Sequence, residues 1–184
     1  MQLEINKPAN SIPVMVGDSN ELTEFEDENI DMGSLNHSLA QTQIVRQLLN
    51  DERFTTIVEL SLDIGQIDLT QFGLDIKREL KPDICLYPKG KVQPDWTCDV
   101  LKMPDMPLLV IEVLSPRQGM DEILRKIRAY FALGIQSCWM VVPTTESITV
   151  YSKPREFISF SMKDTEVIDE VMDIRLSIKK IFNL

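Results

Sequence analysis

An almost uninterrupted apolar run, LLVIEVLS at 108–115, constrains the fold more than any other feature. Such a run suits a central strand that is covered on both faces of its sheet. An amphipathic helix at 119–133 follows, with Gly134 as its end, and a second apolar run occupies 137–143. This strand, helix and strand predict a parallel pair joined by a right-handed crossover. The expected class is therefore α/β or α+β, with a mixed sheet flanked by helices.

The segments on either side supply another helix and further strands. Helical periodicity predicts a helix over 36–49, and apolar positions predict strands at 55–64, 82–87, 147–153 and 157–163, with a short segment at 174–176. The pair at 147–163 resembles a hairpin near a sheet edge. Residues 88–107 are rich in proline, lysine and aspartate, and we expect them to form a long connection.

Length and composition are those of one globular domain. The chain has 184 residues, of which 43% are hydrophobic. We expect a weakly ordered segment at 1–30 and a single domain at 31–184. Apolar runs stay short of the roughly 20 residues of a membrane-spanning helix, and the start lacks the pattern of a secretory signal. The expected location is the cytoplasm.

Charge and cysteine content limit the function. The net charge of −10 argues against a protein that coats nucleic acid, but a local basic groove or a bound cation still permits a nuclease. Three cysteines without a C-x-x-C pair, and a single histidine, argue against zinc and against a disulfide framework. We interpret Cys85 and Cys138 as small buried residues within strands.

Glu112 is the residue least expected at its position. It lies in the middle of the central apolar run, where a carboxylate is costly to bury unless it is paired or binds a metal. One interpretation is a salt bridge to a neighbouring helix. The other is a functional carboxylate.

Asp83 follows Pro82 at the start of a predicted strand. Taken alone it suits a turn aspartate. Together with Glu112 on a neighbouring strand, it would offer the oxygen ligands that magnesium prefers. A cation held there would activate water and stabilise charge on a phosphoryl group.

Lys126 is the candidate third member of this site. At 100° per residue it lies on the flank of the apolar face of the 119–133 helix, from which its amine can reach the sheet. The alternative is an ordinary i,i+4 pair with Glu122.

Three motifs together resemble the Uma-two family, also called domain of unknown function 820: PDICLYP at 82–88, EVLSP at 112–116 and DEILRKIRAY at 121–130. The resemblance extends from about residue 36 through the C-terminal segment. It implies a restriction endonuclease-like fold of the PD-(D/E)XK nuclease superfamily.

The resemblance also implies roles for individual residues. Asp83 and Glu112 would be the two carboxylates of the motif, and the carbonyl of Val113 a further metal ligand. In the standard motif a lysine follows two positions after the second carboxylate, and here that position holds Leu114. Lys126 matches the lysine that the family carries on the helix. His37 matches a frequent family histidine, although a surface or helix-start histidine is the alternative.

Other residues carry weaker expectations. Glu59 is a candidate to face the site, although strand parity does not decide it. Arg117, Arg125 and Arg128 suit either phosphate contacts or a solvated helix face. We interpret Trp96 and Trp139 as packing residues.

The leading hypothesis is an endonuclease that uses Mg²⁺ or Mn²⁺ to hydrolyse phosphodiester bonds of DNA, with a homodimer as a further expectation. Asp83 and Glu112 would hold the metal, and Lys126 would position the nucleophile or stabilise charge. One alternative is a catalytically inactive nuclease fold that binds nucleic acid or protein. Another is an assembly protein that uses the hairpin at 147–163 as a dimer edge.

Overall fold

The computed structural model describes residues 34–65, 67–75 and 80–183. The segment expected to be weakly ordered, 1–30, lies outside these residues. The described elements, in chain order, are α1 (Leu35–Leu48), β1 (Phe54–Val58), η1 (Leu69–Phe72), β2 (Ile84–Pro88), β3 (Leu109–Val113), α2 (Met120–Ala132), β4 (Ser137–Val142), η2 (Pro143–Thr145), β5 (Ser147–Lys153), β6 (Glu156–Ser161), β7 (Glu166–Asp169), β8 (Ile174–Ser177) and α3 (Lys179–Phe182).

Six strands form one mixed sheet in the order β1-β2-β3-β4-β5-β6. The β3–β4 pair is parallel and the other neighbours are antiparallel. This confirms the predicted parallel pair and the expected mixed sheet; the handedness of the connection through α2 stays a prediction. The hairpin prediction is also confirmed, because β5 and β6 pair and β6 lies at the edge.

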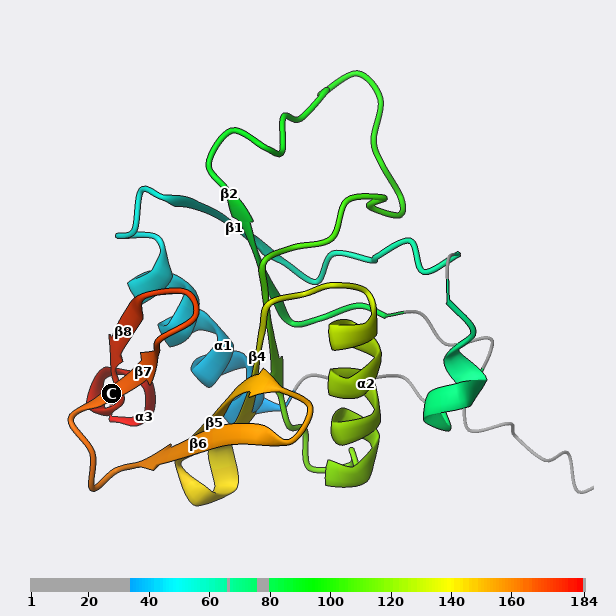
Figure 1. Cartoon of the computed structure of the whole chain (residues 1–184). Coiled ribbons are helices and arrows are strands. Elements are labelled where there is room, and N and C mark those ends of the chain that lie inside the picture. The colour runs from blue at the N-terminus through cyan, green and yellow to red at the C-terminus, as the bar shows by residue number, and fades with distance from the viewer. Residues whose placement is uncertain (1–33, 66, 76–79, 184) are drawn as a thin grey trace, which may run out of the picture. The chain divides into compact units, whose positions relative to one another are not determined.

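The sheet carries an apolar core on each face, as expected for central strands that are apolar throughout. One core contains Ile111 and Val113 of β3 together with residues of α1, β7, β8 and α3. The other contains Val110 of β3 together with residues of α2 and η1. Figure 1 shows the same arrangement, with α1, β7, β8 and α3 on one side of the strands and α2 on the other. Because side chains alternate along a strand, Glu112 shares the α2 face with Val110.

Both long helices follow the predicted periodicity. Ser34 caps α1 by accepting a hydrogen bond from the backbone nitrogen of His37. The end of α2 is followed by Gly134, whose φ of 88° is the left-handed conformation that glycine adopts readily. The predicted end of this helix is therefore confirmed.

Several segments differ from the expectation, among them the short η2 and α3, which were not predicted. The strand predicted over 55–64 ends at Val58, because Glu59 takes a φ of 49° that breaks the ladder. The short β7 strand was not predicted, since its four residues give too little alternation to recognise. The 3₁₀ turn η1 was also not predicted.

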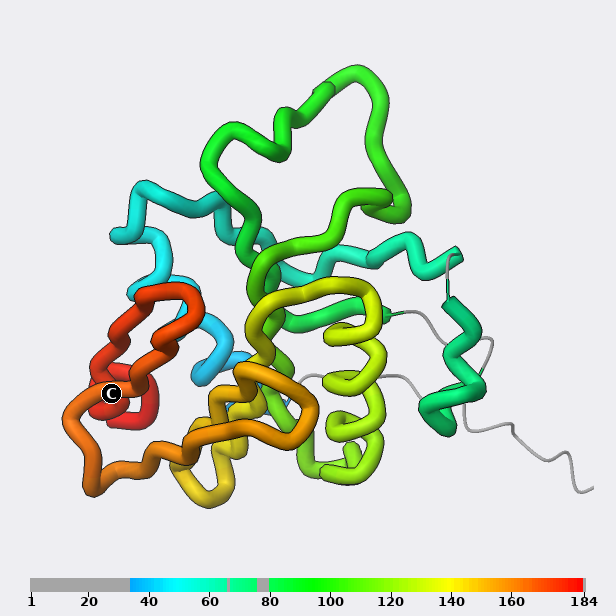
Figure 2. The backbone as a smooth tube through the Cα atoms, viewed as in Figure 1, coloured from blue at the N-terminus to red at the C-terminus, as the bar shows by residue number. Residues whose placement is uncertain are grey.

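The connection between β2 and β3 is long, as expected. Figure 2 shows it as a wide excursion away from the sheet. The end of this connection is held to β2 by Tyr87, whose hydroxyl donates a hydrogen bond to the carbonyl of Asp105 at 3.0 Å. Trp96 lies on this connection and is 93% exposed, so its interpretation as a packing residue is wrong. Trp139 is fully buried in β4, which confirms its packing role.

Candidate active site

The register of β2 and β3 places the two predicted carboxylates opposite each other. Ile84 pairs with Ile111 in this antiparallel ladder. Continuing the register by one position sets Asp83 against Glu112. Directly opposite residues of an antiparallel pair share one face, with Cβ atoms about 5 Å apart. The sheet therefore brings the two carboxylates together at the end of β3 and the start of β2.

Glu112 is held from the side of α2. Its side chain is 3% exposed, and its two oxygens have different partners. Lys126 Nζ lies 3.2 Å from Oε2, and the Tyr130 hydroxyl donates a hydrogen bond to Oε1. The helix presents both donors on one face, because residues four apart lie one above the other. The structure thus joins Lys126 to Glu112, with Glu122 contributing only a weaker charge effect on the lysine.

Burial is the largest single cause that acts on the pKa of each member of this pair. It raises the pKa of the Glu112 carboxyl to about 7; the Lys126 ammonium opposes this rise, and the nearby charge of Asp83 adds to it. For Lys126 burial acts to lower the pKa, but the Glu112 carboxylate outweighs it and the pKa is raised. Burial and the Glu112 charge raise the pKa of Tyr130 well above its ordinary value, so the phenol stays protonated.

Asp83 is held from the opposite side, by α1. His37 Nε2 lies 3.1 Å from Asp83 Oδ1, and the Gln41 side chain donates to the main-chain oxygen of Asp83 at 2.9 Å. The backbone nitrogen of Val113 donates to Oδ2 at 2.6 Å. The Asp83 side chain is 18% exposed and is therefore more open to solvent than Glu112.

Three functional neighbours were missed or undervalued by sequence reasoning. The structure brings His37 to Asp83, although a surface histidine was the alternative kept open for it. Gln41 follows His37 by four residues on the same helix face, and that spacing was the available signal. Tyr130 ends the motif at 121–130, but its hydroxyl gave no separate signal.

The remaining candidates lie outside this group. The backbone nitrogen of Glu59 donates a hydrogen bond to the main-chain oxygen of Asp83 at 3.1 Å. Its carboxylate, however, is more than half exposed and pairs with Lys81 at 3.3 Å. Arg125 donates to the Gly73 carbonyl at 2.9 Å and pairs with Asp121, so it ties α2 to the turn after η1. Arg117 and Arg128 are exposed.

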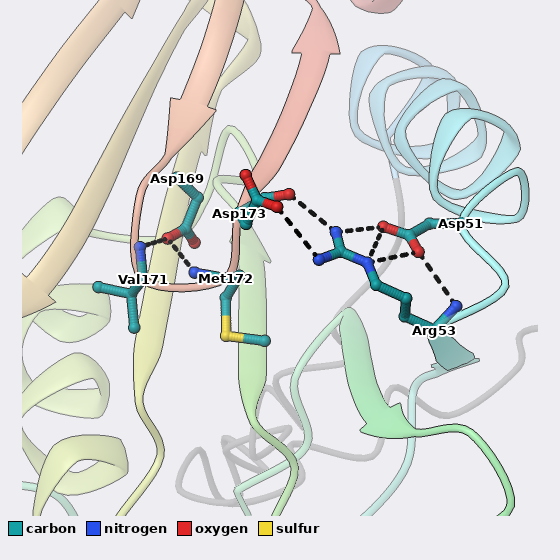
Figure 3. Close-up of polar contacts among 6 residues, drawn as sticks. All are labelled: Asp51, Arg53, Asp169, Val171, Met172 and Asp173. Atoms are coloured by element: carbon teal, nitrogen blue, oxygen red, sulfur yellow. Dashed lines mark hydrogen bonds and ion pairs between the residues drawn. The ribbon is translucent and has the colours of Figure 1, made fainter.

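A second buried carboxylate, Asp169 at the end of β7, was not predicted. Ser137 Oγ and Trp139 Nε1 donate to its Oδ2 at 2.6 and 2.7 Å. Figure 3 shows its other oxygen facing the backbone nitrogens of Val171 and Met172, both at 3.0 Å. Four fixed donors therefore surround this carboxylate in the turn before β8.

The donor set at Asp83 and Glu112 fits a hard divalent cation. Two like charges that lie close together repel each other, and the charge of Asp83 contributes to the rise in the pKa of Glu112. Within residues 34–65, 67–75 and 80–183 there is no group of three or more His, Cys, Asp or Glu side chains that could hold a metal. Magnesium is commonly bound through one or two carboxylates and keeps several waters, so two carboxylates suffice for it.

A mixed sheet flanked by helices, with two carboxylates at the ends of neighbouring strands and a lysine from α2, is the arrangement expected of the restriction endonuclease-like class. The model of the Uma2 family, described as "Putative restriction endonuclease", matches residues 21–178. The chain belongs to this family, and the resemblance predicted from the three motifs is confirmed.

A solved structure shares the fold. It is described as a "putative nuclease belonging to DUF820 from Anabaena variabilis ATCC 29413". It is 22% identical in sequence, with 82% of each chain covered and a TM-score of 0.63. Identity at this level shows the fold alone. No curated protein matches the sequence.

Proposed function

We propose that the chain is an endonuclease that uses Mg²⁺ or Mn²⁺ to hydrolyse phosphodiester bonds of DNA, in the manner of the PD-(D/E)XK superfamily. The observation that carries the proposal is that Asp83 Oδ2 lies 2.6 Å from the backbone nitrogen of Val113, the residue after Glu112, with the Lys126 amine 3.2 Å from Glu112 Oε2. Membership in the Uma2 family, described as "Putative restriction endonuclease", supports it.

Each residue has a distinct task in this proposal. Asp83 and Glu112 hold the cation through carboxylate oxygens. The Val113 nitrogen faces Asp83, and the carbonyl of a strand residue points to the same side as its nitrogen, so this carbonyl suits a third ligand. A bound cation supplies charge neutralisation at the phosphate and a more acidic water.

Lys126 supplies the positive charge that the usual motif places two residues after the second carboxylate. That position holds Leu114, which packs against the apolar core on the α2 side. From α2 the Lys126 amine positions the attacking water or stabilises charge on the phosphate. His37 and Gln41 fix Asp83 by holding its carboxylate and its main-chain oxygen.

The acidic composition is compatible with a DNA substrate. Residues 1–33 contain eight carboxylates and one lysine, a net charge of −7, which leaves −3 for residues 34–184. The domain that carries the site is thus far less acidic than the whole chain. Its exposed Arg117 and Arg128, near and on α2, are available for phosphate contacts.

The test is cleavage of supercoiled plasmid DNA by the full chain with Mg²⁺ or Mn²⁺. Glu112→Gln removes a charge worth several kcal/mol to the transition state, so we expect a rate about 1000-fold lower. Glu156→Gln, which changes an exposed carboxylate on β6, is the matched control and should retain activity. Identical behaviour of wild type and Glu112→Gln would contradict the proposal.

Leu114 in the usual lysine position favours one competing function, a catalytically inactive nuclease fold that binds nucleic acid or protein. Retained DNA binding in a gel-shift assay, with neither cleavage nor calorimetric Mn²⁺ binding, would support that function instead.

A homodimer and a cytoplasmic location stay predictions. β6 is an edge strand on which Phe157 and Ile158 are 57% and 56% exposed, which is the surface expected of a dimer edge. Light scattering on the wild type tests the oligomeric state. None of the helices in the described part of the chain has the length and apolar character that a bilayer crossing demands.

A further inference from the structure

Tyr130 is a fully buried side chain with a polar contact in an apolar core. It belongs to the same apolar core as Ile123 and Ile127 of α2 and strand residues of the sheet. Its hydroxyl donates to Glu112 Oε1. Phenylalanine would fill the same volume, so the hydroxyl contributes the contact with Glu112 and little to packing.

Exposure orders the groups from the interior to the surface. Tyr130 is 0% exposed, the Glu112 side chain 3%, the Lys126 side chain 11% and the Asp83 side chain 18%. The hydroxyl of Tyr130 is therefore buried together with the Glu112 oxygen that it contacts. The other oxygen, Oε2, contacts Lys126, whose side chain is more exposed than that of Tyr130.

We infer that Tyr130 is a positioning residue: its hydroxyl fixes Glu112 through Oε1 and so keeps Oε2 directed toward Lys126 and the cation. This rests on the proposed function. A carboxylate with one oxygen held by a fixed donor loses the freedom to rotate away from its ligand. Groups that hold metal-binding carboxylates in this way typically change metal affinity or activity by about 10–100-fold when they are removed.

Tyr130→Phe tests the role directly, because it deletes only the hydroxyl. We expect plasmid cleavage with a kcat about 10–100-fold lower, an unchanged KM for DNA, and calorimetric Mn²⁺ binding weakened to a similar extent. Tyr87→Phe is the matched control. Tyr87 is equally buried and its hydroxyl also has a partner, the Asp105 carbonyl, on the connection between β2 and β3. It should lose stability without losing Mn²⁺ affinity.

A double variant separates positioning from general destabilisation. If Tyr130 acts through Glu112, then Glu112→Gln combined with Tyr130→Phe binds Mn²⁺ no more weakly than Glu112→Gln alone. Additive losses would overturn the inference.

Fluorine NMR gives a readout that requires neither activity nor a folded Tyr130 variant. The chain has three tyrosines, and 3-fluorotyrosine labels all of them. Tyr87→Phe and Tyr151→Phe assign the signals. Diamagnetic Mg²⁺ should shift the Tyr130 signal, leave the others in place, and have no effect on Tyr130 in Glu112→Gln.

The outcomes distinguish the two claims. Wild-type cleavage with a fully active Tyr130→Phe overturns the positioning role alone. Absence of cleavage, with a Mg²⁺-dependent shift of the Tyr130 signal, overturns the nuclease and supports the positioning role. Absence of both cleavage and metal binding overturns both.

Discussion

Glu112 and Asp169 are both buried carboxylates, but their surroundings are opposite in kind. Asp169 accepts hydrogen bonds from two side chains of β4 and from two backbone nitrogens of its own turn. Glu112 contacts an ammonium and a phenol, and it lies opposite a second carboxylate. The donors of Asp169 are neutral dipoles, while those of Glu112 are ionisable groups.

The difference separates a structural carboxylate from a candidate catalytic one. Fixed neutral donors stabilise the anion and already supply the hydrogen bonds of both its oxygens. Asp169 thereby joins the turn before β8 to β4. At Glu112 the ion pair with Lys126 is opposed by burial and by the charge of Asp83, so an incoming cation would relieve repulsion. Burial of an acid is therefore weaker evidence for a site than the kind of donor around it.

Removing Asp169 should have the largest effect on folding. Asp169→Ala removes the acceptor of at least two buried donors, Trp139 Nε1 and the backbone nitrogen of Met172. At about 1–3 kcal/mol for each unsatisfied group, we expect the free energy of unfolding to fall by about 4 kcal/mol. Urea unfolding measures this, and Mn²⁺ binding by the folded fraction should be unchanged. A loss below about 1 kcal/mol would contradict the structural role.

Glu112 should instead make stability depend on pH. Its pKa is about 7 in the fold, against 4.5 for the ordinary group, so the fold favours the protonated acid. Its contribution to stability is therefore present at low pH and is lost as pH rises from about 4.5 to about 7.

The free energy of unfolding of Glu112→Gln minus that of wild type should therefore rise by roughly 2–3 kcal/mol from pH 5 to pH 8. This holds in buffer without divalent cations. The raised pKa of Lys126 does not change this interval, because that amine stays protonated throughout it. Urea titrations at the two pH values provide the measurement. A constant difference between the two proteins would show that Glu112 is ionised over the whole range.

The contact of His37 with Asp83 should affect activity more than stability. His37→Ala removes the group 3.1 Å from Asp83 Oδ1, and we expect plasmid cleavage about 10-fold slower. Gln41→Ala removes a donor only from the main-chain oxygen of Asp83, so its effect should be smaller. Cleavage rates and thermal unfolding of the two variants decide this. Equal losses would mean that α1 acts through the backbone alone.

Asp173 lies four residues after Asp169 in the same turn, and its substitution should have the smallest effect on stability. Its carboxylate pairs with Arg53 at 3.5 Å and is 86% exposed, and Figure 3 shows both aspartates in one view. Asp173→Asn keeps a residue that tolerates the φ of 52° at this position. We expect a loss below about 0.5 kcal/mol in urea unfolding, as for other exposed ion pairs. A larger loss would show that the turn depends on charge rather than on the donors of Asp169.

Patterns local to the sequence determined the main elements and two members of the site. The apolar run around Glu112 predicted a central strand, and a carboxylate inside such a run is anomalous because of its burial cost alone. Helical periodicity placed Lys126 on the flank of the next helix, and the structure finds it there. These features were predictable because each depends on a period of two or 3.6 residues within a short window.

Tertiary structure alone decided which side chains meet. Asp83 lies opposite Glu112 because of the β2–β3 register, and a shift of one residue would have put them on different faces. His37 and Asp83 are 46 positions apart, and Trp139 and Asp169 are 30 apart, so no local period connects them. The sequence by itself therefore determined that a carboxylate would be buried at 112. The packing of α1, α2 and β7 against the sheet decided that Glu112 would have ionisable neighbours and Asp169 neutral ones, because contacts between distant segments form only when those elements pack.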